Sequence, residues 1–133
     1  MAIMLDTNVI IGGERGTFDL ARWIAAQPNE EFEIAAITVA ELWHGVERAT
    51  RDYRLKRQQY LEAILAVLPV VPYTEQTAYL HARIWAELES SGKMIGFYDV
   101  IVAASALERK STVATFNIRH FAPVPGLQVV LPQ

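Results

Sequence analysis

Short apolar or β-branched runs alternate with helix-patterned segments along the whole of this 133-residue chain. The runs, at about 1–5, 32–37, 70–71, 112–115 and 127–131, predict strands. The segments between them predict helices at about 17–27, 38–48, 50–68, 74–90 and 99–109. Strands that alternate with helices form a parallel sheet through right-handed crossovers. The sequence therefore predicts one domain over residues 1–133, a three-layer α/β/α sandwich around a mainly parallel five-stranded sheet.

The composition restricts the classes of function. The chain has no cysteine, which excludes disulfides, thiolate metal sites and cysteine nucleophiles. Its net charge of −3 lacks the excess of basic residues that is typical of nucleic-acid-binding domains, and its 52% hydrophobic content favours an oligomer or a bound partner. The first residues have no basic start, and no apolar run approaches the ~20 residues of a membrane span. These features predict a soluble, cytoplasmic protein with no membrane segment.

Four polar residues follow a predicted strand or begin a predicted helix: Asp6, Glu41, Asp99 and Asn117. In an open parallel sheet such positions converge on the crevice beyond the carboxyl ends of the strands. Three carboxylates that meet there repel one another unless a cation lies among them. Hard oxygen ligands suit Mg²⁺ or Mn²⁺, which protein carboxylates usually bind together with a substrate phosphate. Such a site activates water and neutralises charge on phosphate oxygens.

Each of the four residues also has a purely structural interpretation. Asp6 and Asp99 are favourable helix N-caps, and Glu41 stands three residues after Thr38, the spacing of a capping box. Asn117 lies in a polar loop, where asparagine commonly bonds its own backbone. Capping does not require all four helix ends to lie on one side of the sheet. The joint pattern therefore favours a site.

Five stretches of the chain carry a family resemblance. In order, they are Leu5-Asp6-Thr7-Asn8-Val9, Thr38-Val39-Ala40-Glu41-Leu42, Asp99 followed by Ile101-Val102-Ala103-Ala104, Thr115-Phe116-Asn117-Ile118-Arg119-His120-Phe121, and Pro125-Gly126-Leu127-Gln128-Val129. In this order and at this length, the chain resembles the PIN domain and, within it, the VapC-type toxins of bacterial toxin–antitoxin pairs. The resemblance covers essentially the whole chain. It implies a PIN-like fold and a Mg²⁺- or Mn²⁺-dependent endoribonuclease.

The resemblance also implies roles for individual residues. The catalytic and metal-binding positions of the family fall on Asp6, Glu41, Asp99 and Asn117. The fourth of these is often aspartate in the family. Because an amide oxygen is a neutral and weaker ligand, Asn117 leaves open whether one metal binds or two. The resemblance places the Thr115 hydroxyl beside the metal ligands and makes Asn8 a brace for the loop of Asp6, although simple turn bonding explains both residues equally well.

The sequence offers few indications of partners. Basic residues cluster between 48 and 57, either as a solvated face or as contacts to an RNA backbone, since phosphate contacts supply most non-specific affinity. The candidate RNA contacts are Arg48 and Arg51 in this cluster, and Arg119 and His120 beside Asn117. The resemblance implies an RNA substrate such as tRNA or rRNA, a cognate antitoxin protein and a homodimer.

Two other functions compete with the ribonuclease. One is a non-catalytic PIN-like module that only binds RNA or protein, against which the intact acids Asp6, Glu41 and Asp99 argue. The other is a phosphatase with an aspartyl-phosphate on Asp6. Its usual second acid, two residues further on, is here Asn8, and no lysine is clearly placed to bind phosphate.

Overall fold

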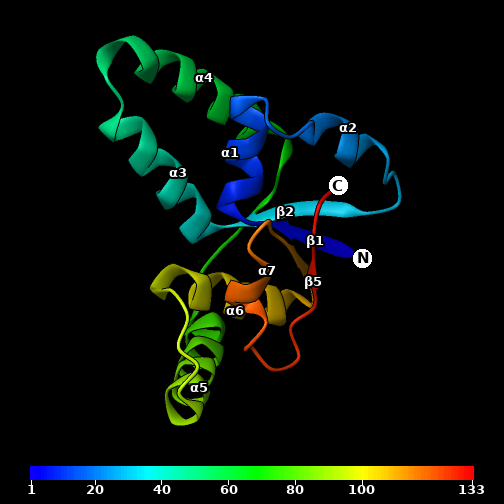
Figure 1. Cartoon of the computed structure of the whole chain (residues 1–133), viewed down its shortest axis with the longest axis vertical. Coiled ribbons are helices and arrows are strands. Elements are labelled where there is room, and N and C mark those ends of the chain that lie inside the picture. Colours follow the sequence, from blue (N-terminus) through cyan, green and yellow to red (C-terminus); the bar gives the residue numbers. More distant parts are fainter.

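Five parallel strands form the centre of the molecule, in the order β3-β2-β1-β4-β5 (Figure 1). The computed structural model describes residues 1–133. Its strands are β1 (Ala2–Leu5), β2 (Glu31–Ala35), β3 (Val70–Val71), β4 (Thr112–Ala114) and β5 (Val129–Val130). All four strand pairs are parallel. The predicted α/β sandwich with its five-stranded parallel sheet is confirmed.

The sheet has a topological switch point between β1 and β4. From β1 the chain adds β2 and β3 on one side and then returns to add β4 and β5 on the other. In open α/β sheets, the crevice beyond the carboxyl ends of the strands at such a point is where ligands bind. The residues that follow β1 and β4 are Asp6 and Thr115. The topology therefore brings two segments that are far apart in sequence to one crevice.

Helices cover both faces of the sheet (Figure 1). Ile3 and Leu5 of β1 pack in a core with the helices of the first half of the chain, whereas Met4 packs in a second core with those of the other half. No helix is long and apolar enough to cross a bilayer. The helices are α1 (Thr7–Arg15), α2 (Leu20–Ala25), α3 (Ala36–Arg48), α4 (Arg51–Val67), α5 (Glu75–Ser91), α6 (Phe97–Arg109) and α7 (Ile118–Phe121).

Helix α6 is the central helix that the sequence predicts. Every residue from Val100 to Ala106 is buried, because almost the whole circumference of the helix is apolar. At its end, Arg109 binds both carboxylate oxygens of the buried Glu33 on β2, at 2.9 and 3.3 Å. The hydroxyl of Ser111 donates a further bond to Glu33. The C-terminal end of α6 is therefore anchored to β2.

Two predicted helix starts are wrong. β2 ends earlier than expected, and Ile37 already belongs to α3. Thr38 lies inside this helix, fully buried and with its hydroxyl unpaired, so it forms no capping box with Glu41. Helix α2 begins after Asp19, whose side chain caps it, and not at Thr17.

Helix α1 continues through two glycines. Glycine is a poor helix former, yet Gly12 and Gly13 both lie within the helix. Gly13 allows a close approach of α4, since a Cβ there would lie 2.6 Å from the hydroxyl oxygen of Tyr60. That hydroxyl donates a hydrogen bond to the carbonyl oxygen of Ile10. Gly16 ends the helix in the left-handed conformation, with φ of 75°.

Helix α5 begins as predicted and buries a different stripe. Thr74 caps it through the backbone N–H of Thr77. Trp85 recurs with Ala78 and Ala82 at helical spacing, which would predict a buried stripe, but its side chain is 44% exposed. The face turned to the core instead presents Ile84 and Leu88.

Candidate active site

Asp6 lies at the centre of the crevice between β1 and β4. It is the N-cap of α1, and its Oδ1 accepts a hydrogen bond from the backbone N–H of Thr7 at 2.9 Å. Its Oδ2 accepts a bond from the hydroxyl of Thr115 at 2.8 Å, and the side chain is almost fully buried. Asp6 is thus both a helix cap and a fixed carboxylate in the crevice.

Thr115 connects the loop after β4 to this carboxylate. While it donates to Asp6, its hydroxyl oxygen accepts bonds from Nδ2 of Asn8, at 3.3 Å, and from the backbone N–H of Asn117, at 3.0 Å. The Oδ1 of Asn8 accepts a bond from the backbone N–H of Phe116. Thr115 thus lies beside Asp6, where the resemblance placed it. Through its bonds to Thr115 and Phe116, Asn8, two residues after Asp6, connects the start of α1 to the loop after β4.

Thr7 joins the second acid to the first. Its hydroxyl donates a 3.0 Å hydrogen bond to Oε1 of Glu41 on α3, while its backbone N–H binds Asp6. One residue therefore holds carboxylates from two separate elements. The sequence pattern alone did not predict this role, although the position of Thr7 directly after Asp6 in the first motif could have suggested it.

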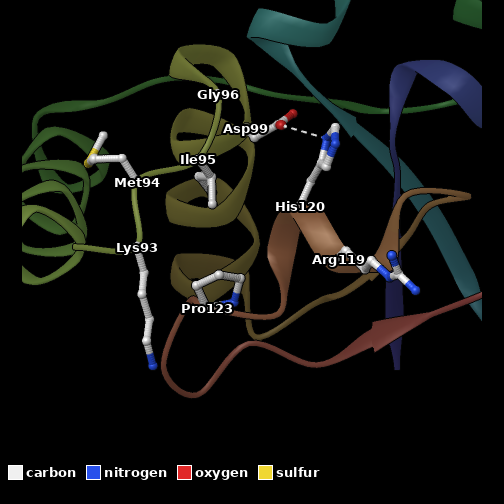
Figure 2. Close-up of a pocket in the computed structure, with 8 residues that line it drawn as sticks. All are labelled: Lys93, Met94, Ile95, Gly96, Asp99, Arg119, His120 and Pro123. Atoms are coloured by element: carbon white, nitrogen blue, oxygen red, sulfur yellow. Dashed lines mark ion pairs between the residues drawn. The ribbon is translucent and has the colours of Figure 1, made fainter. Parts of the chain in front are cut away.

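Asp99 reaches the crevice from the first turn of α6. The N-cap of this helix is Gly96, so the capping interpretation of Asp99 is wrong. Its Oδ2 lies 3.4 Å from Nδ1 of His120 on α7, which points toward it (Figure 2). A Cβ at Gly96 would lie 3.0 Å from the same oxygen. The missing side chain of Gly96 leaves room for this carboxylate, a role that the sequence analysis did not assign.

Asn117 lies differently from the three acids. It is exposed, occupies the N-cap position of α7, and its side chain makes no hydrogen bond. Only its backbone N–H is tied to the crevice, through Thr115. Of its two basic neighbours, His120 points to Asp99, whereas Arg119 extends away from it (Figure 2). Arg48 and Arg51 lie elsewhere, at the end of α3 and the start of α4.

The three acids share an unfavourable electrostatic environment. Burial raises the pKa of Asp6, although the hydrogen bonds from Thr115 and Thr7 lower it. The pKa of Glu41 is raised first by burial and further by the charges of Asp6 and Asp99. The pKa of Asp99 is raised by burial and by Asp6, and the charge of His120 opposes that rise. The crevice therefore concentrates negative charge that a cation would stabilise.

These donors fit a hydrated Mg²⁺ or Mn²⁺ ion. No three Asp, Glu or His side chains lie close enough together to enclose one metal ion by themselves. Mg²⁺, however, keeps several waters and is held by one or two carboxylates together with substrate phosphate. Carboxylates with raised pKa values, two of them bonded to threonine hydroxyls, provide hard oxygen donors and unbalanced charge of the kind that this ion requires.

A cavity of about 500 Å³ opens beside Asp99 (Figure 2). Three basic residues line it, and two of these, Lys93 and Arg119, take part in no ion pair. An anionic group in this cavity would lie next to Asp99. The lining consists of Lys93, Met94, Ile95, Gly96, Asp99, Arg119, His120 and Pro123.

Comparison with known proteins identifies the family. Residues 3–127 match the PIN domain. The chain belongs to the PIN domain family. It is 36% identical to the VapC ribonuclease Y4jK of Sinorhizobium fredii, over 98% of this chain and 96% of that protein. It is 30% identical to the tRNA(fMet)-specific endonuclease VapC of Salmonella typhimurium, over 97% and 96% of the two chains.

A solved structure supports the same assignment. The chain superimposes with a TM-score of 0.93 and 25% identity on a chain of VapBC2 from Rickettsia felis bound to a DNA fragment from their promoter. The match covers 100% of both chains. The protein is therefore a PIN-domain member of the VapC ribonuclease family, and the resemblance inferred from the motifs is confirmed.

Proposed function

We propose that this protein is a Mg²⁺- or Mn²⁺-dependent endoribonuclease and the toxin of a type II toxin–antitoxin pair. The observation that carries the proposal is the set of three carboxylates with raised pKa values at the β1/β4 switch point: Asp6, Glu41 and Asp99. They come from three different elements of a chain that belongs to the PIN domain family. Its relatives named as VapC ribonucleases support RNA as the substrate.

In this proposal the protein positions its acids before the metal and RNA arrive. When bound, the divalent cation activates water and neutralises charge on the phosphate. Thr7 and Thr115 hold the carboxylate of Asp6, and Thr7 also holds Glu41, so that both keep fixed orientations. Fixed carboxylates need no reorganisation when charge develops. His120 and Arg119, on the cavity side, would meet the phosphates of the RNA.

The proposed partners follow from the relatives. Structures of VapBC complexes are known for the Rickettsia felis and Salmonella typhimurium proteins. We expect a cognate antitoxin here whose segment brings an arginine to the acids, a tRNA or rRNA substrate, and action in the cytoplasm. We also expect a homodimer, because exposed aromatic residues remain on α5 and α6, among them Tyr79, Trp85 and Phe97. Light scattering that shows a strict monomer at high concentration would contradict the dimer.

A cleavage assay tests the activity. Purified protein with Mg²⁺ or Mn²⁺ is expected to cut structured RNA internally, and EDTA to stop the cleavage. Asp6→Asn and Asp99→Asn are each expected to lower the rate by orders of magnitude, while the exposed Asp52→Asn retains it. Undiminished cleavage by both crevice variants would indicate a contaminant or another site. Growth arrest on expression that is lost in Asp6→Ala would support the toxin role.

The same assay separates the competing functions. A non-catalytic module would bind RNA without cutting it. A phosphatase would need a second acid two residues after Asp6. Both polar atoms of the Asn8 side chain that stands there are already bonded, to Thr115 and Phe116. An acid-resistant phosphoryl adduct on Asp6 would revive the phosphatase.

A further inference from the structure

A second basic cavity, of about 600 Å³, lies where the end of α1, the end of α3 and the start of α4 meet. We call it the distal basic pocket and define it by Arg15, Arg48, Lys56 and Tyr53. Four cations and one acid line it in all, the other two charges being Arg57 and Glu14. The arrangement joins segments separated by about forty residues, so the fold and not a local run of charge creates it.

The charge of this pocket is not neutralised within the protein. Arg57 and Glu14 bind each other, with nitrogen–oxygen distances of 3.0 and 3.4 Å. Arg15, Arg48 and Lys56 take part in no ion pair and are exposed. After the internal pair is subtracted, three positive charges remain around one concave surface. Such a surface attracts an anionic chain.

An exposed aromatic ring belongs to the same surface. Tyr53, in the first turn of α4, is 65% exposed. Its hydroxyl makes no hydrogen bond within the protein, whereas Tyr60, deeper in the pocket, donates to the carbonyl oxygen of Ile10. A basic groove that carries exposed aromatic rings is the usual arrangement for binding single-stranded nucleic acid, because bases stack on the rings while cations bind the backbone.

The distal basic pocket is connected to the acids by one face of α3. Glu41, His44 and Arg48 are spaced i, i+3 and i+7 and therefore lie along the same side of the helix. A smaller cavity of about 300 Å³ adjoins the acids on this side and is lined in part by Glu41, His44 and Tyr98. At 1.5 Å per residue, Arg48 stands about 10 Å beyond Glu41 along the helix axis.

We propose that the distal basic pocket binds the sugar-phosphate backbone of the RNA substrate. The bound part is the stretch of RNA that leaves the scissile phosphate on the side of Glu41. The inference rests on the proposed ribonuclease function and adds the path that the RNA takes across the protein surface. The strand would cross the acids, follow the face of α3 past His44, and place its phosphates between Arg15, Arg48 and Lys56. Tyr53 would stack on a base. An acidic protein segment would also suit the charge, but the exposed ring of Tyr53 and the path along α3 to the acids favour RNA.

Binding of fluorescent single-stranded RNA of mixed sequence tests the proposal. Measured on the Asp6→Asn background to prevent cleavage, Arg48→Gln/Lys56→Gln is expected to weaken binding about tenfold at low salt. The slope of log affinity against log salt is expected to fall by about 1.4, at about 0.7 for each lost phosphate contact. Tyr53→Ala is expected to weaken binding about tenfold with no change in the slope. The control Arg22→Gln/Arg83→Gln removes the same charge elsewhere on the surface. It is expected to retain the affinity and the salt slope of the protein with an intact pocket.

Cleavage kinetics provide the second measurement. In the protein with intact acids, Arg48→Gln/Lys56→Gln is expected to raise KM about tenfold and to leave kcat unchanged. The difference from wild type is expected to disappear for RNAs shortened from one end until they no longer reach the pocket.

Equal affinity and equal salt slope in the charge variant and its control would overturn the inference, whatever the cleavage result. An acidic peptide that loses affinity in Arg48→Gln/Lys56→Gln, while RNA does not, would overturn it in favour of a protein partner. Failure of the wild-type protein to cleave any RNA would instead contradict the proposed function.

Discussion

The hydroxyl of Thr115, directly after β4, donates a 2.8 Å hydrogen bond to the carboxylate of Asp6, directly after β1. The backbone N–H of Asp6 in turn donates to the carbonyl oxygen of Ala114 at 2.9 Å. These two bonds join the strands at the switch point of the sheet. The first of them also lowers the pKa of Asp6, which burial raises. The hydroxyl of Thr115 thus favours the ionised form of Asp6, the most buried of the three acids.

Removal of this hydroxyl is therefore expected to affect ionisation as well as rate. In Thr115→Val the pKa of Asp6 loses a lowering contribution, so the acidic limb of the pH–rate profile moves to higher pH. Loss of a hydrogen bond to a charged group costs ~1.5–3 kcal/mol, which would lower kcat roughly ten- to a hundredfold. Thr115→Ser keeps the hydroxyl and is expected to restore the profile. An acidic limb that stays in place in Thr115→Val would mean that Thr115 only shapes the loop.

The acids are expected to destabilise the metal-free fold. The pKa values of Asp6, Glu41 and Asp99 are raised in the folded state, so the folded protein binds protons more tightly than the unfolded chain. Stability contributed by these groups is therefore greatest below the unfolded pKa of ~4 and is lost as pH rises through the raised folded values. Mg²⁺ is expected to reverse this loss at neutral pH.

Asp99→Asn tests this dependence. Because it removes one of the repelling charges, it is expected to raise the apo melting temperature at neutral pH by about 2–5 °C and to reduce the stabilisation by Mg²⁺. Calorimetry in EDTA between pH 4 and pH 8 measures the difference, which is expected to vanish at the acidic end. A variant that melts below wild type throughout would show that the contact of Asp99 with His120 outweighs the repulsion.

The sequence predicted the order of the five strands and of five of the seven helices, because each of these strands is a short apolar run and each of these helices has a longer pattern. The start of α3 could not be predicted in this way. Ala35, Ala36 and Ile37 suit a buried strand as well as a buried helix, and the N-cap residue, Ala35, has no side chain that can cap. The exposed position of Trp85 was equally unpredictable, since helical spacing does not show which of two neighbouring stripes faces the core.

The candidate site was predictable in its backbone positions and not in its side-chain contacts. Asp6, Glu41 and Asp99 were found because strand ends of a parallel sheet meet in one crevice. The bridge that Thr7 forms between two acids depends on the start of α1 and on the rotation of α3 about its axis. The contact between His120 and Asp99 depends on the short helix α7, for which the sequence has no periodic signal.

Close packing of α1 against α4 makes Gly13 sensitive to substitution. In Gly13→Ala the new methyl group would lie 2.6 Å from the hydroxyl oxygen of Tyr60 and 3.0 Å from Cβ of Leu20. Such overpacking is expected to lower the free energy of unfolding by about 1–3 kcal/mol in urea denaturation. Gly45→Ala is a matched helical control, because its nearest neighbour lies at 3.4 Å.

A double-mutant cycle with Tyr60→Phe identifies the cause. Removal of the hydroxyl removes the closest contact, so Gly13→Ala is expected to cost less in the Tyr60→Phe background. Rescue is expected to be incomplete, since the contact with Leu20 remains. Strict additivity of the two substitutions would mean that α1 moves as a unit and that the clash with Tyr60 is not decisive.

The number of metal ions that the crevice binds depends, we propose, on Asn117. We propose that its side-chain oxygen, which makes no hydrogen bond in this structure, approaches a weaker metal position when the ion binds. Three acids with a total charge of −3 would bind one divalent cation well and a second only when a substrate phosphate adds charge. Asn117→Asp is therefore expected to tighten Mn²⁺ binding and to lower the metal concentration that gives the half-maximal rate. Asn117→Ala is expected to reduce activity less than Asp99→Asn does.

Calorimetric titration of Mn²⁺ into wild type and Asn117→Asp provides the measurement. Gln59→Glu adds the same charge on the exposed face of α4 and controls for net charge alone. If Asn117 only shapes the loop through its N–H bond to Thr115, aspartate would turn the chain nearly as well and leave metal binding unchanged. Identical isotherms for wild type and Asn117→Asp would therefore exclude the ligand role. Tighter binding in Asn117→Asp but not in Gln59→Glu would place the fourth family position at the metal, because only a charge within the crevice acts on the ion at short range.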